Sequence, residues 1–460
     1  MPVSAIDSFL FKNLFGTQPI RKVFEDRTYV DYYCMKVEVG LALAQASCGI
    51  IPKVSANEIA DVATRLSLDY DRLSEETEIV GYPILPLVRQ LSEGCGEDAG
   101  RYVHWGATTQ DIQDTAAILQ MKDGLDLVEA KLKSLTATLS ALASKYRDTP
   151  MAGRTHLQHA LPVTWGYKCA VYLSSFQRHL ERLQQLRPRC LLVQFGGAAG
   201  TLASLGSDAE QSLQVRKTLA KQLDLEDPSI TWHTARDGIA EIVNFLALIG
   251  GTLGKLATDL IIMSSNEFNE VSEPFVPHRG ASSTMPQKRN PISSEVVLAA
   301  SKILRSNAGL CLDAMITDFE RASGPWHLEW AAVPESFVIA VGALSQADFA
   351  MAGLVINTDQ MSRNLNSTKG LIVAEAVMME LTKTVGRQRA HDIVYEACKE
   401  TIESMNASQR LFDTLMKKEV VMSALAPERL AELCMPGNYL GAAGTMVDNV
   451  LGLNAGLGVL

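Results

Sequence analysis

Residues 239–263 form the most apolar stretch of this 460-residue chain, and they limit its fold more than any other segment. Glu241, Lys255, Asp259 and three glycines interrupt the stretch, and no uncharged run within it reaches the roughly 18 residues that a membrane span needs. A helix that is apolar on most faces must be buried on most faces. We therefore expect no membrane span but a central helical bundle, which other subunits of the same protein help to complete.

Apolar residues recur at helical spacing along most of the chain, whereas alternating strand patterns are scarce. The pattern predicts long helices over residues 28–48, 111–145, 163–186 and 237–266. Asp111 is expected to cap the second of them, with Asp114 three residues further on. The prediction is an all-α fold with a smaller N-terminal region at 1–110, the long helices at 111–355 and a smaller helical tail at 356–460.

Composition narrows the class of protein. Hydrophobic residues make up 47% of the chain and charged residues 20%, which is typical of a soluble protein, and the net charge of −10 argues against non-specific binding to nucleic acid. The eight cysteines form no CxxC pair and have no histidine at zinc spacing, so we expect reduced thiols, a cytoplasmic protein and no metal site. Residues 1–7 carry no pattern of a secretion signal, and the glycines at 196–200 lack the strand–helix context of a nucleotide loop, so no organic cofactor is expected.

One short segment carries most of the chemical information: Ser282-Ser283-Thr284-Met285-Pro286-Gln287-Lys288-Arg289-Asn290-Pro291. Its prolines predict a loop, which Pro291 ends because a helix is expected from residue 292 onward. A cation and an amide can hold a carboxylate while a serine oxygen faces the neighbouring carbon. By composition alone, a polar surface loop explains the segment equally well.

The segment resembles the signature G-S-S-x-M-P-x-K-x-N-P of the fumarase/aspartase superfamily. It matches every fixed position except the first, where Ala281 follows Gly280. Two further stretches resemble the other signature segments of that superfamily and occur in the same order, residues 104–111 (HWGATTQD) and 153–162 (GRTHLQHALP). The resemblance extends from about residue 10 to the C-terminus.

Within the superfamily, the chain is most similar to the 3-carboxy-cis,cis-muconate cycloisomerase branch, with adenylosuccinate lyase next. The segments that carry this likeness are 232–237 (WHTARD), 326–330 (WHLEW) and 438–443 (NYLGAA). Bacterial cycloisomerases of the branch often have tryptophan after the Arg-Thr of the second signature segment. This chain has His156, as the lyases do, which favours an acid–base lyase.

The resemblance implies a fold of three helical domains and a homotetramer built around a long central helical bundle. In this superfamily, each active site takes its three signature segments from three different subunits. Members break a bond β to a carboxylate without a cofactor, and fixed donors must then hold the extra negative charge on that carboxylate. A small polycarboxylic acid is therefore the expected substrate.

The same resemblance assigns roles to single residues. Ser282 matches the first serine of the loop motif and is the candidate base, provided that backbone amides or Lys288 stabilise its alkoxide. His156 is the candidate general acid. Arg236 matches a substrate-side arginine, although an ion pair with Asp237 or Glu241 would also explain it. The other predicted substrate contacts are His104 at the distal end of the substrate and the charge-holding group Thr108, Thr109, Thr155, Lys288 and Asn290.

Four functions remain open from the sequence. The leading one is a cofactor-independent lyase or cycloisomerase acting on a di- or tricarboxylic acid, similar to 3-carboxy-cis,cis-muconate cycloisomerase. The alternatives are adenylosuccinate lyase, a decarboxylase of an unsaturated tricarboxylate such as trans-aconitate, and a non-enzymatic structural protein of the crystallin type. The joint presence of Ser282, His156, Lys288 and Asn290 argues against the last.

Overall fold

The computed structural model of the chain describes residues 4–321, 324–406 and 408–456. They form two compact units, which are described separately. The first unit comprises the chain up to Leu132 together with His179–Gly254 and Val296–Gln346. The second comprises Lys133–Arg178, Lys255–Glu295 and the chain from Ala347 onward. The predicted division at 1–110, 111–355 and 356–460 stays a prediction.

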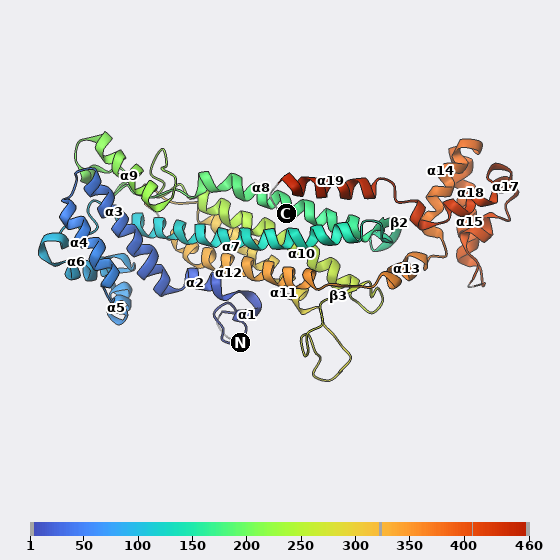
Figure 1. The fold of residues 1–460 in the computed structure, drawn as a ribbon, viewed down its shortest axis with the longest axis horizontal. Coiled ribbons are helices and arrows are strands. Elements are labelled where there is room, and N and C mark those ends of the chain that lie inside the picture. The colour runs from blue at the N-terminus through green and yellow to red at the C-terminus, as the bar shows by residue number, and fades with distance from the viewer. Residues whose placement is uncertain (1–3, 322–323, 407, 457–460) are drawn as a thin grey trace. The chain divides into compact units, whose positions relative to one another are not determined.

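Short helices make up the N-terminal part of the first unit (Figure 1). Helix α3 packs against α4 and α9, and α6 packs against α4 and α5. The expected helix at 28–48 has a π-helical first part, η1, before α3 continues it. The bounds are α1 Lys12–Phe15, α2 Gln18–Phe24, η1 Thr28–Cys34, α3 Met35–Ser47, α4 Lys53–Arg65, α5 Tyr70–Val80, α6 Ile84–Gly100, the 3₁₀ turn η2 Ala203–Leu205 and α9 Ala209–Leu223.

Five long helices have residues in both units: α7 Thr109–Lys145, α8 Trp165–Cys190, α10 Asp237–Met263, α11 Ile292–Asp313 and α12 Pro325–Ala352. The predicted cap of α7 was wrong, because the helix already begins at Thr109 and Asp111 is its third residue. The Asp111 carboxylate instead accepts the Thr108 backbone N–H at 3.0 Å, which is the returning arm of a capping box. Pro291 directly precedes α11, as predicted.

Helix α10 is the apolar helix that the sequence singled out. Within the first unit, Ile242, Val243 and Leu246 are fully buried. Gly250 lets α11 approach closely, since a Cβ atom there would lie 2.8 Å from a methyl carbon of Leu304. Leu248 is 54% exposed, so the burial expected on most faces of the helix is incomplete within the single chain.

By length and hydropathy, two of the described helices, α10 and α12, could cross a membrane. Half of the relevant window of α10 and 67% of that of α12 are buried inside the protein, and buried core helices of soluble proteins pass the same test. The expected absence of a membrane span stays a prediction.

The second unit contains a hairpin that the sequence did not predict. Strands β1 (Pro150–Thr155) and β2 (Gln158–Thr164) pair antiparallel, so the helix expected from residue 163 begins only at Trp165. A second two-stranded pair joins β3 (Val271–Ser272) to β4 (Val355–Ile356). The strands are short and helices dominate the described residues, which confirms the all-α prediction.

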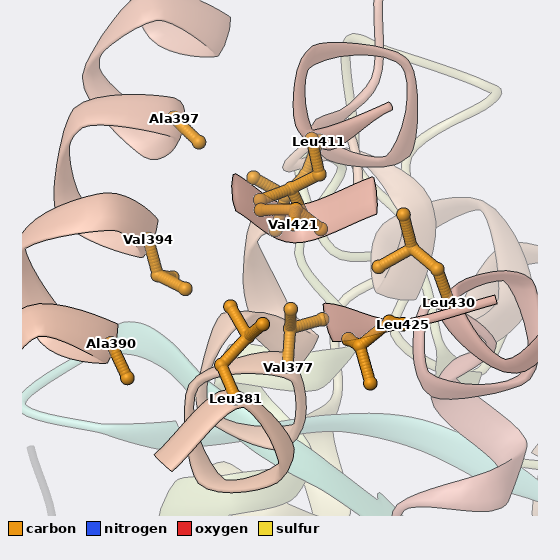
Figure 2. Packing of buried hydrophobic residues seen from close by; sticks show 10 residues of the cluster. Val377, Leu381, Ala390, Val394, Ala397, Leu411, Val421, Leu425 and Leu430 are labelled. Atoms are coloured by element: carbon orange, nitrogen blue, oxygen red, sulfur yellow. The ribbon is translucent and has the colours of Figure 1, made fainter. Parts of the chain in front are cut away.

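The C-terminal helices of the second unit have a small core of their own (Figure 2). Val377 and Leu381 of α14 face Ala390 and Val394 of α15, with Leu411 and other leucines of the following short helices packed against them. The bounds are α13 Thr358–Asn366, η3 Leu371–Val373, α14 Ala374–Val385, α15 Arg387–Glu403, α16 Leu411–Leu415, α17 Glu419–Ala424, α18 Pro427–Leu433, η4 Pro436–Asn438 and α19 Ala443–Gly456.

Candidate active site

The predicted site residues fall into both units. His104, Thr108, Thr109 and Arg236 belong to the first unit, whereas Thr155, His156, Ser282, Lys288 and Asn290 belong to the second. Within each unit they lie at the ends of helices, on a hairpin tip or on a loop. Among the described residues, no hydrogen bond joins Ser282 to His156.

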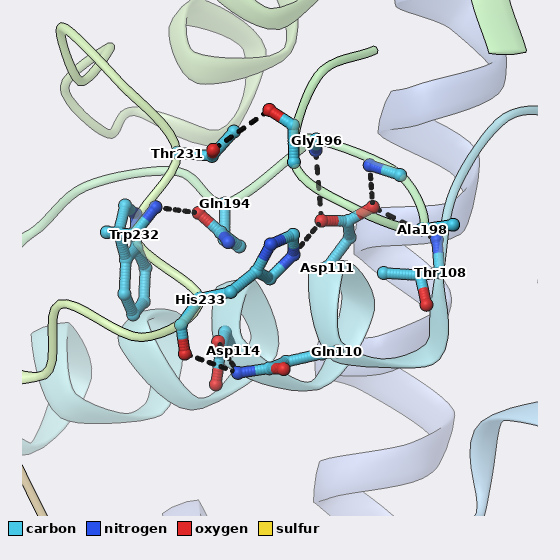
Figure 3. A network of polar contacts seen from close by, with 12 residues as sticks. Thr108, Gln110, Asp111, Asp114, Gln194, Gly196, Ala198, Thr231, Trp232 and His233 are labelled. Carbon is cyan, nitrogen blue, oxygen red and sulfur yellow. Dashed lines mark hydrogen bonds and ion pairs between the residues drawn. The ribbon is translucent and has the colours of Figure 1, made fainter. Parts of the chain in front are cut away.

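Asp111 organises the first signature segment from inside the protein (Figure 3). Its side chain is 1% exposed and accepts the backbone N–H groups of Gly196 at 3.0 Å and Gly197 at 2.9 Å, in addition to that of Thr108. The Nε2 atom of His233 lies 2.7 Å from its Oδ1 atom. The glycine-rich turn is therefore bound to the start of α7, which gives these glycines a structural role.

Thr108 and Thr109 stand at the N-terminus of α7, and both are half-buried. The free backbone N–H groups and the dipole at a helix N-terminus favour an anion. His104 precedes them on the connecting loop, with a φ of +61°. This left-handed conformation is uncommon for a residue other than glycine and concentrates at functional sites. The three residues thus present one imidazole and two hydroxyls at a helix start.

Arg236 does not reach an open surface in the single chain. Its guanidinium is 1% exposed and donates to two carboxylates. The two terminal nitrogens bond to Asp114 at 2.7 and 2.9 Å, and Nε bonds to Glu329 at 2.9 Å. Trp326 Nε1 also donates to Asp114, at 3.1 Å. The predicted contact of Arg236 with substrate is untested, but this geometry makes the residue a buried structural cation.

His156 occupies the tip of the hairpin between β1 and β2. Thr155 pairs with Gln158, and the two residues between them, His156 and Leu157, have φ angles of +52° and +61°. Positive φ at both central positions is the pattern of a type I′ turn, which usually takes Asn-Gly. Both residues are exposed, so the strained turn leaves the imidazole accessible to solvent.

A buried ion pair supports this hairpin. Arg154 of β1 binds Glu270 through two bonds of 2.6 and 3.0 Å, and Asn364 donates to the same carboxylate at 2.8 Å. Arg154 and His156 both line a cavity of about 500 Å³ in the second unit. Lys168 and Lys255, which share the carboxylate of Asp259, also line it, so the cavity next to His156 carries more than one cation.

Ser282 sits at the start of a closed loop. Its Oγ atom accepts the backbone N–H groups of Thr284 at 3.3 Å and Met285 at 3.1 Å. This is a serine turn, and the same two amides can stabilise a Ser282 alkoxide, which a catalytic base of this type requires. The loop is closed by Asn290, whose backbone and side-chain N–H groups both donate to the carbonyl of Gly280. A Cβ atom on Gly280 would lie 2.5 Å from the Asn290 carbonyl oxygen, so only glycine fits there.

Lys288 is exposed on this loop, and among the described residues its ammonium group forms no ion pair. A cation without a carboxylate partner is available for an anionic ligand. The side-chain amide of Asn290, in contrast, already holds the loop closed through its nitrogen. Its predicted contact with substrate would have to use the amide oxygen or follow a rearrangement of the loop.

Sequence reasoning missed the carboxylates that hold these groups in place. Asp111 lies inside the first signature segment, but the sequence predicted only a helix cap for it. No role was predicted for Glu38 or Glu270. Their partners are 66 to 122 residues away in sequence, so no local pattern reveals the pairs. Among the described residues, no three histidine, cysteine or acidic side chains cluster as a metal site. The expected absence of metal and cofactor stays a prediction.

Two models of known protein families match the chain. The family model described as "Lyase" matches residues 16–304, and the model described as "Adenylosuccinate lyase C-terminus" matches residues 370–450. The chain belongs to the fumarase/aspartase superfamily. It is an enzyme of that superfamily with the all-α fold of its members, and the non-enzymatic alternative is set aside.

Three relatives cover nearly the whole chain. The chain is 44% identical over 439 residues to trans-aconitate decarboxylase 1 of Mycosarcoma maydis, covering 95% of this chain and 88% of that protein. It is 40% identical over 449 residues to 3-carboxy-cis,cis-muconate cycloisomerase of Acinetobacter baylyi, covering 96% and 98%. The crystal structure of a fumarate lyase from Mesorhizobium sp. BNC1 superposes with a TM-score of 0.89 at 52% identity, covering 95% and 98%.

Proposed function

We propose that this superfamily member is a cofactor-independent, cytoplasmic lyase or cycloisomerase similar to 3-carboxy-cis,cis-muconate cycloisomerase. It works by acid–base chemistry next to a carboxylate of a di- or tricarboxylic acid. The observation that carries the proposal is the position of Ser282 Oγ against two backbone amides on the signature loop. Relatives that are named for reactions of polycarboxylates support the substrate class.

The proposed chemistry follows from the residue types. Ser282 removes a proton from the carbon next to the substrate carboxylate, which places additional negative charge on the carboxylate oxygens. Lys288 and the hydroxyls of Thr108, Thr109 and Thr155 hold that charge, because fixed donors stabilise it more strongly than water can. In a lyase reaction the bond between the β carbon and the leaving group then breaks as a C=C bond forms, and His156 gives its proton to the leaving group. In a cycloisomerisation the same step runs in reverse: a carboxylate oxygen of the substrate adds to one carbon of a C=C bond, the Ser282 O–H gives its proton to the carbon next to another carboxylate, and no group is lost.

Decarboxylation of a tricarboxylate is the second candidate. The specific observation in its favour is the 44% identity to trans-aconitate decarboxylase 1 over 95% of the chain. Here the C–C bond to the carboxylate of the CH2 arm breaks and carbon dioxide leaves. The freed electron pair forms a new C=C bond, and a proton from His156 or Ser282 is added to the far carbon of the original double bond, which gives itaconate. The residues required are the same, so residue identity does not separate the two reactions.

A substrate panel separates the candidates. Purified protein is incubated with 3-carboxy-cis,cis-muconate, trans-aconitate and adenylosuccinate, and the ultraviolet absorbance of the conjugated acids is followed. Loss of the muconate absorbance with formation of a lactone supports the cycloisomerase. Release of carbon dioxide with formation of itaconate supports the decarboxylase. Fumarate from adenylosuccinate points to the remaining lyase, and no turnover of any of the three contradicts the proposal.

Lys288→Met should raise KM and lower kcat, because it removes a charge-assisted contact of about 1.5–3 kcal/mol to the carboxylate. Steady-state kinetics on the active substrate of the panel measure both parameters. Arg289→Met is the matched control, since Arg289 is the adjacent loop cation and stacks on Phe275. Unchanged kinetics of Lys288→Met would remove the assigned role.

We further propose a homotetramer whose sites combine segments of different subunits. The incomplete burial of the apolar helix α10 supports this assembly. Inactive Ser282→Ala and His156→Ala proteins are mixed, gently dissociated and reassociated. If the two residues come from different subunits, random assortment gives about a quarter of the sites both wild-type residues, and that share of activity returns.

Two results would contradict the assembly. A monomer in light scattering excludes it altogether. A tetramer that regains no activity after mixing excludes the shared site but leaves the tetramer in place. Each parent protein, dissociated and reassociated alone, is the control for recovery.

A further inference from the structure

A buried carboxylate holds the histidine of the first signature segment. Glu38 Oε1 lies 2.7 Å from His104 Nδ1, and the side chain of Glu38 is 1% exposed. Glu38 comes from the middle of α3, 66 residues before the histidine. Its other oxygen, Oε2, is buried without a hydrogen-bond partner among the described residues. A carboxylate in this position depends on the imidazole for compensation of its charge.

Helix α3 fixes the loop of His104 at a second point. Gln45, seven residues after Glu38, donates its side-chain N–H to the carbonyl of Trp105 at 2.6 Å. His104 has a left-handed backbone conformation and its side chain is 19% exposed. Since Nδ1 is bound to Glu38, Nε2 lies on the opposite edge of the ring, where no described residue bonds to it. The ring is therefore fixed through Nδ1, while Nε2 remains available to bind a ligand.

We infer that Glu38 is a positioning residue for His104, which fixes the ring and keeps a proton on Nε2 so that the imidazolium can bind a carboxylate of the substrate. The inference rests on the proposed function, because it gives His104 a carboxylate to bind. It adds a residue outside the three signature segments to the substrate-binding apparatus. Glu38 acts through His104 and does not touch the substrate itself.

The charges around the pair support a protonated ring. Burial acts to lower the pKa of His104, but the adjacent Glu38 carboxylate, with a smaller contribution from Asp111, raises it above the ordinary value. Asp111 on α7 and Cys34 at the end of η1 are the other described titratable groups that interact with the pair. Asp111 is bound to His233, and burial raises the pKa of the Cys34 thiol, so neither replaces Glu38 as the partner of His104.

Substitution of Glu38 by glutamine separates its hydrogen bond to His104 from the effect of its negative charge. Glu38→Gln keeps an oxygen that can accept from Nδ1–H but removes the negative charge, so the pKa of His104 should fall. Because the pKa is raised in the wild type, the protonated ring is present at low pH and is lost as the pH rises through the raised pKa. In Glu38→Gln this loss should occur at lower pH, and KM for the polycarboxylate should rise about tenfold at neutral pH, with kcat changing less.

The pKa of His104 can be measured without activity. Diethyl pyrocarbonate modifies the neutral imidazole, and peptide mass spectrometry gives the rate for His104 as a function of pH in the intact protein. The midpoint for His104 should move to lower pH in Glu38→Gln and stay in place in Glu58→Gln, which removes an exposed carboxylate of α4 that pairs with Arg65. An unchanged midpoint in Glu38→Gln overturns the inference whatever the enzyme does in the substrate panel.

The wild-type protein provides a test that does not depend on the folding of a variant. His104 should titrate above the ordinary histidine value of about 6.5, measured in the same digest as the exposed His391. A midpoint at or below that value overturns the inference. A shifted midpoint in Glu38→Gln with an unchanged KM also overturns it, because His104 would then be positioned for something other than the substrate.

Discussion

Ser282→Ala should abolish nearly all turnover while the protein stays folded. A positioned base contributes roughly 10²–10⁴-fold to the rate of such a proton transfer, and alanine has no oxygen to accept the proton. The two backbone amides that now face Ser282 Oγ would lose their acceptor, but they lie on an exposed loop where water replaces it. The measurement is kcat on the active substrate, together with circular dichroism to verify the fold.

The neighbouring Ser283 provides a matched control. It has the same side chain, it is exposed, and among the described residues its hydroxyl does not bond to the loop amides that face Ser282. Ser283→Ala should therefore keep most of the wild-type kcat. The assignment of the base is wrong if Ser282→Ala retains more than half of the wild-type kcat, and it passes to Ser283 if the two variants exchange behaviour.

The helices of this protein could be predicted because their signals are local. Apolar residues at helical spacing placed α7, α10 and α11 within a few residues of their observed bounds, and Pro291 marked the start of α11 correctly. The hairpin at 150–164 escaped prediction because its turn holds His-Leu in place of Asn-Gly. The conformation there is imposed by long-range contacts such as that of Arg154 with Glu270, which a local pattern cannot contain.

The candidate site divides in the same way. The serine, lysine and histidine of the signature segments could be predicted from sequence, because a base, a carboxylate-binding cation and a general acid each require a particular side chain. The residues that hold them in place could not be predicted, since only the fold brings Glu38 into contact with His104 and Asp111 into contact with His233. Arg236 shows the limit most clearly. Arg236 was predicted to contact substrate, with an ion pair to its sequence neighbours Asp237 or Glu241 as the alternative. The structure pairs it with Asp114 and Glu329, and Glu241 pairs with Arg189.

Arg236→Met should destabilise the first unit by about 3–5 kcal/mol, because removing one member of a buried ion pair leaves its partners charged and unpaired. Both Asp114 and Glu329 would be left in this state, at 2% and 6% exposure. The measurement is the urea midpoint followed by tryptophan fluorescence, since Trp326 donates to Asp114 and Trp232 stacks on the guanidinium. Arg189→Met is the control: its pair with Glu241 is exposed, so its loss should cost only about 0–1 kcal/mol.

The pH dependence of this variant gives an independent check on the mechanism. In the wild type, the pKa of Glu329 is already raised, mainly by burial and against the effect of Arg236. Without Arg236, the pKa of Glu329 in the folded state should rise further above that of the unfolded chain. A carboxyl group with a raised folded-state pKa loses stability as the pH rises through that pKa and regains it on acidification. The stability difference between variant and wild type should therefore narrow as the pH is lowered from 8 toward about 5. A difference independent of pH would mean that lost packing of the arginine side chain, and not its unpaired carboxylates, causes the destabilisation.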